Sequence, residues 1–405
     1  MAPGQPSVLP AAAALALGTA VSLGLARFSY ALLLAPMRAD LGWTYLIAGA
    51  MNTANAAGYL AGALLAGPLL RRVPTKALFF WSTAATGAFL ALHGAVASDA
   101  ALYALRFASG LLSAATLISG ALLAARLVGE SPASTRPGVR PPSAGLVLGV
   151  YYGGTGVGIV VSALLLPPLV ERPVGHAWQA AWIALGALSL LAALVIAVAL
   201  RGRLMHGRTP AAAAASTRGR SRAFDAALLS YVLFGLGYIG YMTFVLALLR
   251  EQGLGPTGIV AFYSVLGLAV IASSWLWAGL LQRSRGGGAM SLLNALLAVA
   301  TMLPVLSSHP AAVFASGLLF GAVFLSLVAS TTSLVRHNLP AAQWGRWIGT
   351  FTIAFAVGQI VGPSLAGWIA DVAGGLRAGL ACSAAVLALA TLAAWRQKPL
   401  AAAAA

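Results

Sequence analysis

One arginine of this sequence falls deep inside a long apolar run. Arg27 lies in the run 11–35, about eight residues or about 12 Å of helix from its end. A guanidinium buried in lipid costs roughly 2.5 to 3.5 kcal/mol and needs acceptors. Its planar donors match a carboxylate or phosphate. We therefore predict that Arg27 binds an anion, and the alternative is an arginine tied to backbone carbonyls of a neighbouring helix.

A second interior arginine, Arg106, lies about five residues into the run 101–125, so its long side chain could also reach the boundary. The 7 acidic residues all fall in loops or at the ends of runs. The interior carboxylate that a carrier of organic cations needs is therefore missing, and an anionic substrate is favoured. Asp371 and Glu171, at matched ends of two runs, are the candidates for proton coupling, although charges at such ends are commonly solvated.

Uncharged polar side chains add further candidates for substrate contact. Asn52, Asn55 and Tyr59 recur at the i, i+3 and i+7 positions of one helix face. The alternative for each is a hydrogen bond between helices, a common use of polar groups in membranes. The predicted substrate-binding set is Arg27, Tyr30, Asn52, Asn55, Tyr59, Arg106, Tyr238, Tyr241 and Gln359.

The elements that must position these groups are membrane helices. Apolar residues make up 60% of the 405-residue chain, charged residues make up 8%, and the mean hydropathy is +0.91. Such a chain has too little polar surface for a water-soluble globule. Runs long enough to cross about 30 Å of hydrocarbon predict an all-α membrane protein of about twelve transmembrane helices. They cover 11–35, 45–69, 77–97, 101–125, 144–170, 178–200, 225–249, 259–281, 288–306, 310–335, 345–370 and 375–395.

The net charge of +17 indicates how the chain is oriented in the membrane rather than a nucleic-acid-binding function. Most Lys and Arg lie in alternate loops, as in 71–76, 126–140 and 201–222, whereas the opposite loops hold few. By the positive-inside rule the basic loops and both termini are cytoplasmic, in a bacterial inner membrane. A nucleic-acid partner is therefore not expected.

The chain divides into two halves. The Arg-rich stretch 201–223, with the low-complexity run 211–215, is predicted to be a cytoplasmic linker between six-helix bundles 1–200 and 224–405. An internal repeat supports this division, because Gly145, Gly149 and Gly158 align with Gly345, Gly349 and Gly358. Repeats related by an axis along the membrane normal are typical of transporters.

Several kinds of chemistry lack the residues they need. One cysteine and 5 scattered histidines give no metal-ligand spacing, and no Walker-type phosphate loop is present. No nucleophile, base or metal set can be assembled for an enzyme. We expect no catalytic residues, no metal and no cofactor.

Local motifs resemble the major facilitator superfamily over essentially the whole chain. The stretch 67–76 is similar to the family's basic loop, with Arg71 where aspartate is usual, and Arg106 and Gly110 match its fourth helix. The stretches 26–30 and 52–59 look like the YbfB-like branch. The resemblance implies two six-helix bundles, a substrate site lined by the first and fourth helices, and proton coupling or helix bracing by Arg106.

These features together predict a monomeric secondary transporter that moves a small organic anion by alternating access. Efflux of lipophilic or drug-like compounds is the alternative, and it would not need Arg27. The expected partners are the small-molecule substrate, membrane lipid and, if transport is coupled, a proton.

The predicted orientation can be checked by accessibility labelling. A single cysteine placed at Arg208 should react only from the cytoplasmic side, and one placed at Asp99 only from outside, because the basic loops mark the cytoplasm. Labelling of both positions from the same side would contradict the three spans, 101–125, 144–170 and 178–200, that are predicted to lie between them.

Overall fold

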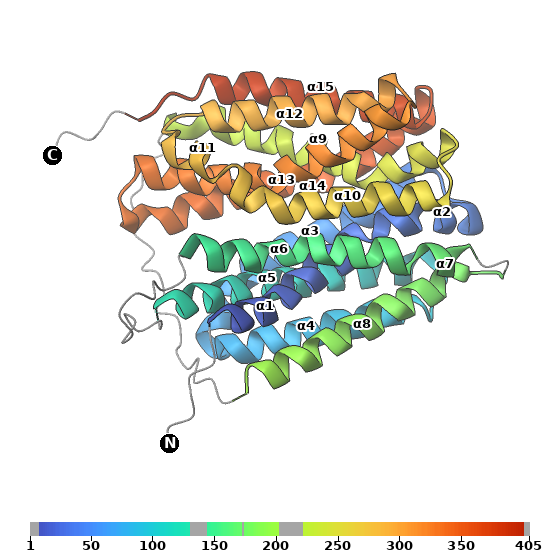
Figure 1. Ribbon diagram of the computed structural model, residues 1–405, viewed down its shortest axis with the longest axis horizontal. Coiled ribbons are helices and arrows are strands. Elements are labelled where there is room, and N and C mark those ends of the chain that lie inside the picture. Colours follow the sequence, from blue (N-terminus) through green and yellow to red (C-terminus); the bar gives the residue numbers. More distant parts are fainter. Residues whose placement is uncertain (1–7, 130–143, 172–173, 202–221, 401–405) are drawn as a thin grey trace. The chain divides into compact units, whose positions relative to one another are not determined.

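The structure is a computed structural model that describes residues 8–129, 144–171, 174–201 and 222–400 (Figure 1). Every regular element in this part of the chain is helical. The helices of the first half are α1 (Val8–Thr19), η1 (Ala20–Phe28), α2 (Tyr30–Leu41), α3 (Tyr45–Arg72), α4 (Thr75–His93), α5 (Asp99–Gly129), α6 (Ala144–Leu165), α7 (Pro167–Val170) and α8 (Ala177–Ala199).

The described elements of the second half are also helical. Its elements are η2 (Arg222–Phe224), α9 (Asp225–Glu251), α10 (Pro256–Leu276), α11 (Ala278–Arg283), α12 (Gly288–Leu306), α13 (Pro310–Asn338), α14 (Ala341–Val372) and α15 (Leu376–Trp395). The predicted linker, 201–223, lies almost wholly outside the described residues.

The helices are long and apolar enough for a multi-pass membrane protein. Ten spans in the described chain meet both requirements, and the first runs without a break from Val8 to Leu41. That span is longer than the predicted 11–35. Helices α3 and α4 are 28 and 19 residues long, enough to cross the bilayer, but carry more polar residues such as Asn52 and Asn55. The prediction of an all-α membrane protein with about twelve spanning helices is confirmed.

Contacts divide the described residues into two compact units. The first unit holds residues of 1–29 and 58–210, and the second holds 30–57 together with residues of 211–405. The second unit thus includes the end of the first span and the start of α3, because α2 packs against α9 and side chains of α3 bond to α9 and α14. The six-helix halves 1–200 and 224–405 remain a prediction.

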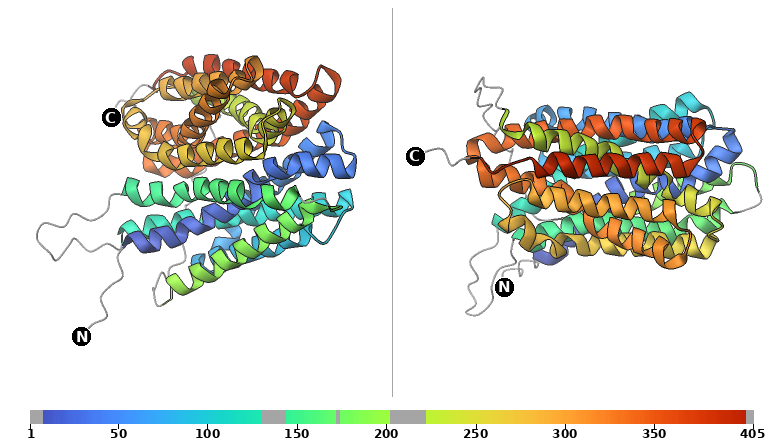
Figure 2. Two further views of the ribbon diagram at one scale, coloured as in Figure 1. Left: turned by 45° about the vertical axis from the view of Figure 1, so that its right-hand side comes forward. Right: turned by 90° about the horizontal axis from the view of Figure 1, so that it is seen from above.

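In the first unit, η1 lies among the other helices of that unit. It packs against α6, α5, α4 and α8, and α4 runs beside both α5 and α8 (Figure 1). In the second unit, α9 packs between α14 and α15, and α12 packs against α13 and α15 (Figure 2). Each unit therefore surrounds one helix that carries candidate polar residues.

Residues Ala20–Phe28 form a π-helix inside the first span. The amide of Ser29 donates to the carbonyl of Gly24 at 3.0 Å, five residues back. A π-helical stretch is uncommon and is often found at functional sites. The sequence analysis did not predict it.

Close packing of η1 on α6 requires glycine. A Cβ atom added to Gly24 would lie 2.5 Å from the Cα of Gly158 and 3.0 Å from the carbonyl oxygen of Thr155. Backbone atoms cannot rotate away as a side-chain tip can. The two helices can therefore approach this closely only without a side chain at Gly24, as is common between membrane helices.

We expect Gly24→Ala to destabilise the protein because the added methyl group overlaps backbone. The cost should be about 1 to 3 kcal/mol, typical of overpacking. Thermal unfolding of purified protein measures it. Gly67→Ala is the matched control, because a Cβ at this helical glycine meets nothing within 4 Å. Equal stability of the two variants would contradict the packing described here.

Candidate functional site

Arg27 is a buried cation within the π-helix. Its side chain is 4% exposed, and its guanidinium carbon lies 5.5 Å from the centre of the Tyr59 ring. Its Nη2 atom is buried and has no hydrogen-bond acceptor among the described residues. The alternative of an arginine held by backbone carbonyls is thus not what the structure shows at this nitrogen. Arg27 has a donor to offer to a ligand.

Arg106 is held in a different way. It is fully buried rather than extended to a boundary, and its Nη1 donates to the backbone carbonyl of Ala26 at 2.7 Å. Its guanidinium carbon lies 5.7 Å from the centre of the Trp182 ring. Arg106 therefore ties α5 to the π-helix at the residue directly before Arg27.

Three hydroxyl groups near η1 in the first unit also lack partners. The buried Oγ atoms of Ser22 and Ser113 and the buried Oγ1 of Thr155 have no hydrogen bond among the described residues. They belong to η1, α5 and α6, which pack against one another. Buried hydroxyls without a partner are costly, so they indicate positions where water or a ligand can bind. Sequence reasoning missed all three, because single Ser and Thr residues in apolar helices carry no distinctive pattern.

The candidates in the second unit form two separate groups of contacts. Gln359 of α14 donates through Nε2 to the hydroxyl of Tyr238, while its buried Oε1 has no partner among the described residues. Tyr241 shares a 2.7 Å hydrogen bond with Ser316 of α13 and stacks on Phe320 with ring centres 4.0 Å apart. Both tyrosine hydroxyls thus have a side-chain hydrogen-bond partner.

An aromatic cluster surrounds Tyr238. Its ring stacks with Phe234 at 4.8 Å, with Phe355 at 5.5 Å and with Phe324 at 6.1 Å between centres. Tyr231 stacks on Phe355 at 4.9 Å. The cluster offers apolar ring surface beside one amide oxygen.

Tyr30, Asn52 and Asn55 lie in the second unit, and two of them bond to its backbone or side chains. Tyr30 donates to the carbonyl of Ala48 at 2.8 Å, and Asn52 donates to Thr243 Oγ1 on α9 at 2.8 Å. Asn55 is 1% exposed. The neighbouring Thr53 bonds to Ile360 and Ser364 of α14 at 2.7 and 2.8 Å. The Asn52 contact is of the kind weighed as the alternative for this residue, a hydrogen bond that joins one helix to another.

Asp371 caps the start of α3. Its carboxylate oxygens accept from the backbone amides of Tyr45 and Leu46 at 2.9 and 2.8 Å. A carboxylate at a helix N-terminus satisfies free amides and interacts favourably with the helix dipole. The hydroxyl of Tyr45 also bonds to the carboxylate of Glu251, and the guanidinium carbon of Arg38 lies 3.8 Å from the Tyr45 ring centre.

Glu171, the other coupling candidate, differs from Asp371. It is exposed and ends the short helix α7, where its backbone amide donates to the carbonyl of Pro167 at 3.2 Å. Glu171 and Asp371 occupy matching positions of the sequence repeat, but their contacts in the structure differ.

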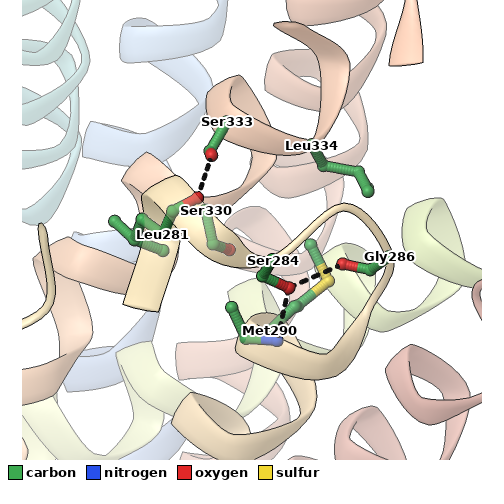
Figure 3. Close-up of a pocket in the computed structure, with 8 residues that line it drawn as sticks. Leu281, Ser284, Gly286, Met290, Ser330, Ser333 and Leu334 are labelled. Atoms are coloured by element: carbon green, nitrogen blue, oxygen red, sulfur yellow. Dashed lines mark hydrogen bonds between the residues drawn. The ribbon is translucent and has the colours of Figure 1, made fainter. Parts of the chain in front are cut away.

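A small pocket at the end of α11 does not resemble a substrate site. It is lined by Leu281, Ser284, Met290, Ser330 and Leu334 among others, and holds about 210 Å³ including space open to solvent (Figure 3). Because part of this volume is open solvent, the enclosed space is well below the roughly 300 to 1,000 Å³ of usual ligand pockets. Ser284 and Ser333 at its rim bond to backbone atoms of the pocket, so they offer few free groups.

Comparisons with solved structures show the fold. A variant of the nucleoside transporter NupG aligns with a TM-score of 0.73 at 13% identity, over 95% of this chain and 100% of that one. A bacterial homologue of the human lysosomal transporter Spinster gives 0.70 at 13% identity, over 97% and 98%. The human organic anion transporter MFSD10 (TETRAN) gives 0.63 at 14% identity, over 96% and 100%.

Sequence comparison gives the family. No curated protein matches the sequence. The family described as "Uncharacterised MFS-type transporter YbfB" matches residues 19–395, which include Arg27, Arg106 and every helix from η1 to α15. A multi-pass helical chain with this match over nearly its whole length belongs to the YbfB-type transporters of the major facilitator superfamily.

Proposed function

We propose that this protein is a secondary transporter of a small organic anion, moved across the bacterial inner membrane by alternating access. The single observation that carries the proposal is the buried Nη2 of Arg27, which has no acceptor among the described residues. A carboxylate or phosphate supplies both the acceptor and the countercharge.

Electrostatics supports an anion over a cation. Arg106 is a second buried cation, bonded to the carbonyl next to Arg27, so the first unit carries positive charge inside the membrane. A bound anion offsets this charge, whereas an organic cation would add to it. The unpaired hydroxyls of Ser22, Ser113 and Thr155 suit further polar groups of the substrate.

The remaining predictions are part of the same proposal. Both termini face the cytoplasm, the chain acts as a monomer in lipid, and a proton is the proposed coupling ion. Tyr59, whose ring centre lies 5.5 Å from the guanidinium carbon of Arg27, and the bonded pair Gln359 and Tyr238 remain predicted substrate contacts. Tyr30, Asn52, Asn55 and Tyr241 are kept as secondary contacts.

Efflux of lipophilic compounds is the second candidate. The aromatic cluster around Tyr238 supports it, because stacked rings bind apolar and aromatic ligands well. The solved structures of similar fold include transporters named for nucleosides and for organic anions.

A thermal-shift screen of the purified protein separates the two candidates. A ligand that binds the folded state raises the unfolding temperature. We expect organic acids to raise it and cationic drugs not to. Stabilisation by lipophilic cations alone, with no response to any acid, would favour efflux and overturn the anion proposal.

Arg27→Lys should weaken binding of the stabilising acid while the protein still folds. Lysine keeps the charge but loses the planar pair of donors, so we expect a loss of about ten- to a hundredfold, the value of a charge-assisted hydrogen bond. Arg27→Ala should abolish binding and leave stability unchanged or higher, since a buried unpaired charge is costly. Arg377→Ala, which removes an exposed arginine, is the control. An unfolded Arg27→Ala beside a fully active Arg27→Lys would make Arg27 a structural brace.

Asp371→Asn tests the proposed coupling role of the cap on α3. The amide keeps one acceptor oxygen but turns donors toward the second backbone amide, so one of the two hydrogen bonds is lost. We expect the dissociation constant of the substrate to stay within about threefold of the wild-type value, because Asp371 is not predicted to contact the substrate. The pH profile of transport should change. Glu171→Gln is the matched control. An unchanged pH profile would remove Asp371 from coupling.

A further inference from the structure

A histidine that the sequence analysis left aside is buried in the first unit. His93 is the last residue of α4 and is 0% exposed. Its ring stacks on Trp182 of α8, with centres 4.4 Å apart and planes 23° apart. Its Nδ1 lies 2.7 Å from the backbone carbonyl of Phe89. The ring is therefore fixed in position by two contacts.

The partner of Nδ1 defines which ring nitrogen is free. A carbonyl oxygen can only accept, so Nδ1 carries the hydrogen in this bond. In the neutral ring Nε2 is then a bare acceptor. Nε2 is buried and has no hydrogen-bond partner among the described residues. A buried acceptor with no donor is costly and marks a position where a proton can be added.

The charged and titratable groups around His93 are dominated by arginine. Helix α4 packs against α5, α8 and η1, and of these α8 carries no charged residue between its ends. Arg106 on α5 acts electrostatically on His93 and also lies near Trp182, 5.7 Å from its ring centre. The other such groups on these elements are Arg27 on η1, Asp99, Tyr103 and Arg126 on α5, Lys76 on α4 and His176 before α8.

We propose that His93 Nε2 is a proton-binding site of this transporter, linked through Arg106 to the anion site at Arg27. Arg106 is shared by both positions, because it lies beside the His93–Trp182 stack and donates to Ala26, next to Arg27. The proton site stands on the geometry of His93. Its coupling role rests on the proposed anion transport.

Charge explains why proton and anion would bind together. A protonated His93 beside Arg106 places two buried cations close to each other, which is unfavourable without a countercharge. An anion at Arg27 supplies that countercharge. Because linkage is reciprocal, a lower pH must then tighten anion binding by the factor by which the anion favours protonation. The proton and the anion are taken up as a pair, with no change in net charge.

Trp182 provides a direct readout, because a protonated imidazole stacked on an indole quenches its fluorescence more than a neutral one. We expect no His93-dependent quenching step in the ligand-free wild type at any pH at which the protein stays folded, because burial and Arg106 both favour the neutral ring. A quenching step should appear when the stabilising acid is bound or when Arg106→Gln removes the nearby cation. His93→Gln and Trp182→Phe should each abolish the step.

The titration with bound acid and the titration of Arg106→Gln are independent experiments. If Arg106→Gln folds poorly, the titration with bound acid still tests the proton site. If no acid stabilises the protein, the titration of Arg106→Gln still tests it. A step that persists in His93→Gln, or no step in either arm, overturns the proton site. In binding measurements, the wild type should bind the acid up to about tenfold more tightly per unit fall in pH, and His93→Gln should show no such dependence. Equal dependence in both proteins overturns the coupling.

The outcomes separate this inference from the proposed function. Anion binding that needs Arg27 but ignores His93 would leave the transporter proposal in place and refute the proton site. A His93-dependent step in Arg106→Gln with no response to any acid would support the proton site, refute its link to an anion and count against the anion proposal.

Discussion

A guanidinium inside a membrane helix must find its hydrogen-bond acceptors within the protein, because lipid offers none. Arg106 meets this requirement with the carbonyl of Ala26, whereas Nη2 of Arg27 has no acceptor among the described residues. The packing around the π-helix depends on this difference between the two arginines. One arginine is used to fix the π-helix in place, and the fixed π-helix then holds the second arginine with a donor to spare.

The π-helix and its glycine give this arrangement its geometry. Gly24 lets η1 approach the backbone of α6 at Gly158, and Thr19 bonds to the carbonyl of Tyr151 at 2.5 Å one turn earlier. These contacts fix the helix from one side while Arg106 fixes it from α5. The stiffness matters because a cation can discriminate between ligands only if it cannot move to pair with a backbone carbonyl instead.

Polar groups in the second unit are used differently. Asp371, Asn52 and Thr53 join α3 to α9 and α14, so the start of α3 is held by a helix cap and by hydrogen bonds between side chains. Such contacts can be exchanged in small steps, since each is worth only about 1 kcal/mol. Under the proposed alternating access, they suit an element whose contacts exchange, while the buried arginines suit a fixed ligand site.

The sequence alone determined the class of protein, because hydropathy, run length and the distribution of arginine follow directly from the demands of a bilayer. It also selected Arg27, since a lone charge in an apolar run stands out without any structure. It could not show that Arg106 bonds to Ala26 or that His93 stacks on Trp182, because these partners are 80 residues apart in one case and belong to different helices in the other. The π-helix was equally hidden, since its residues have the same hydropathy pattern as an α-helix. Which polar groups are satisfied and which are free depends on the packing of neighbouring helices, and only the tertiary structure decided that.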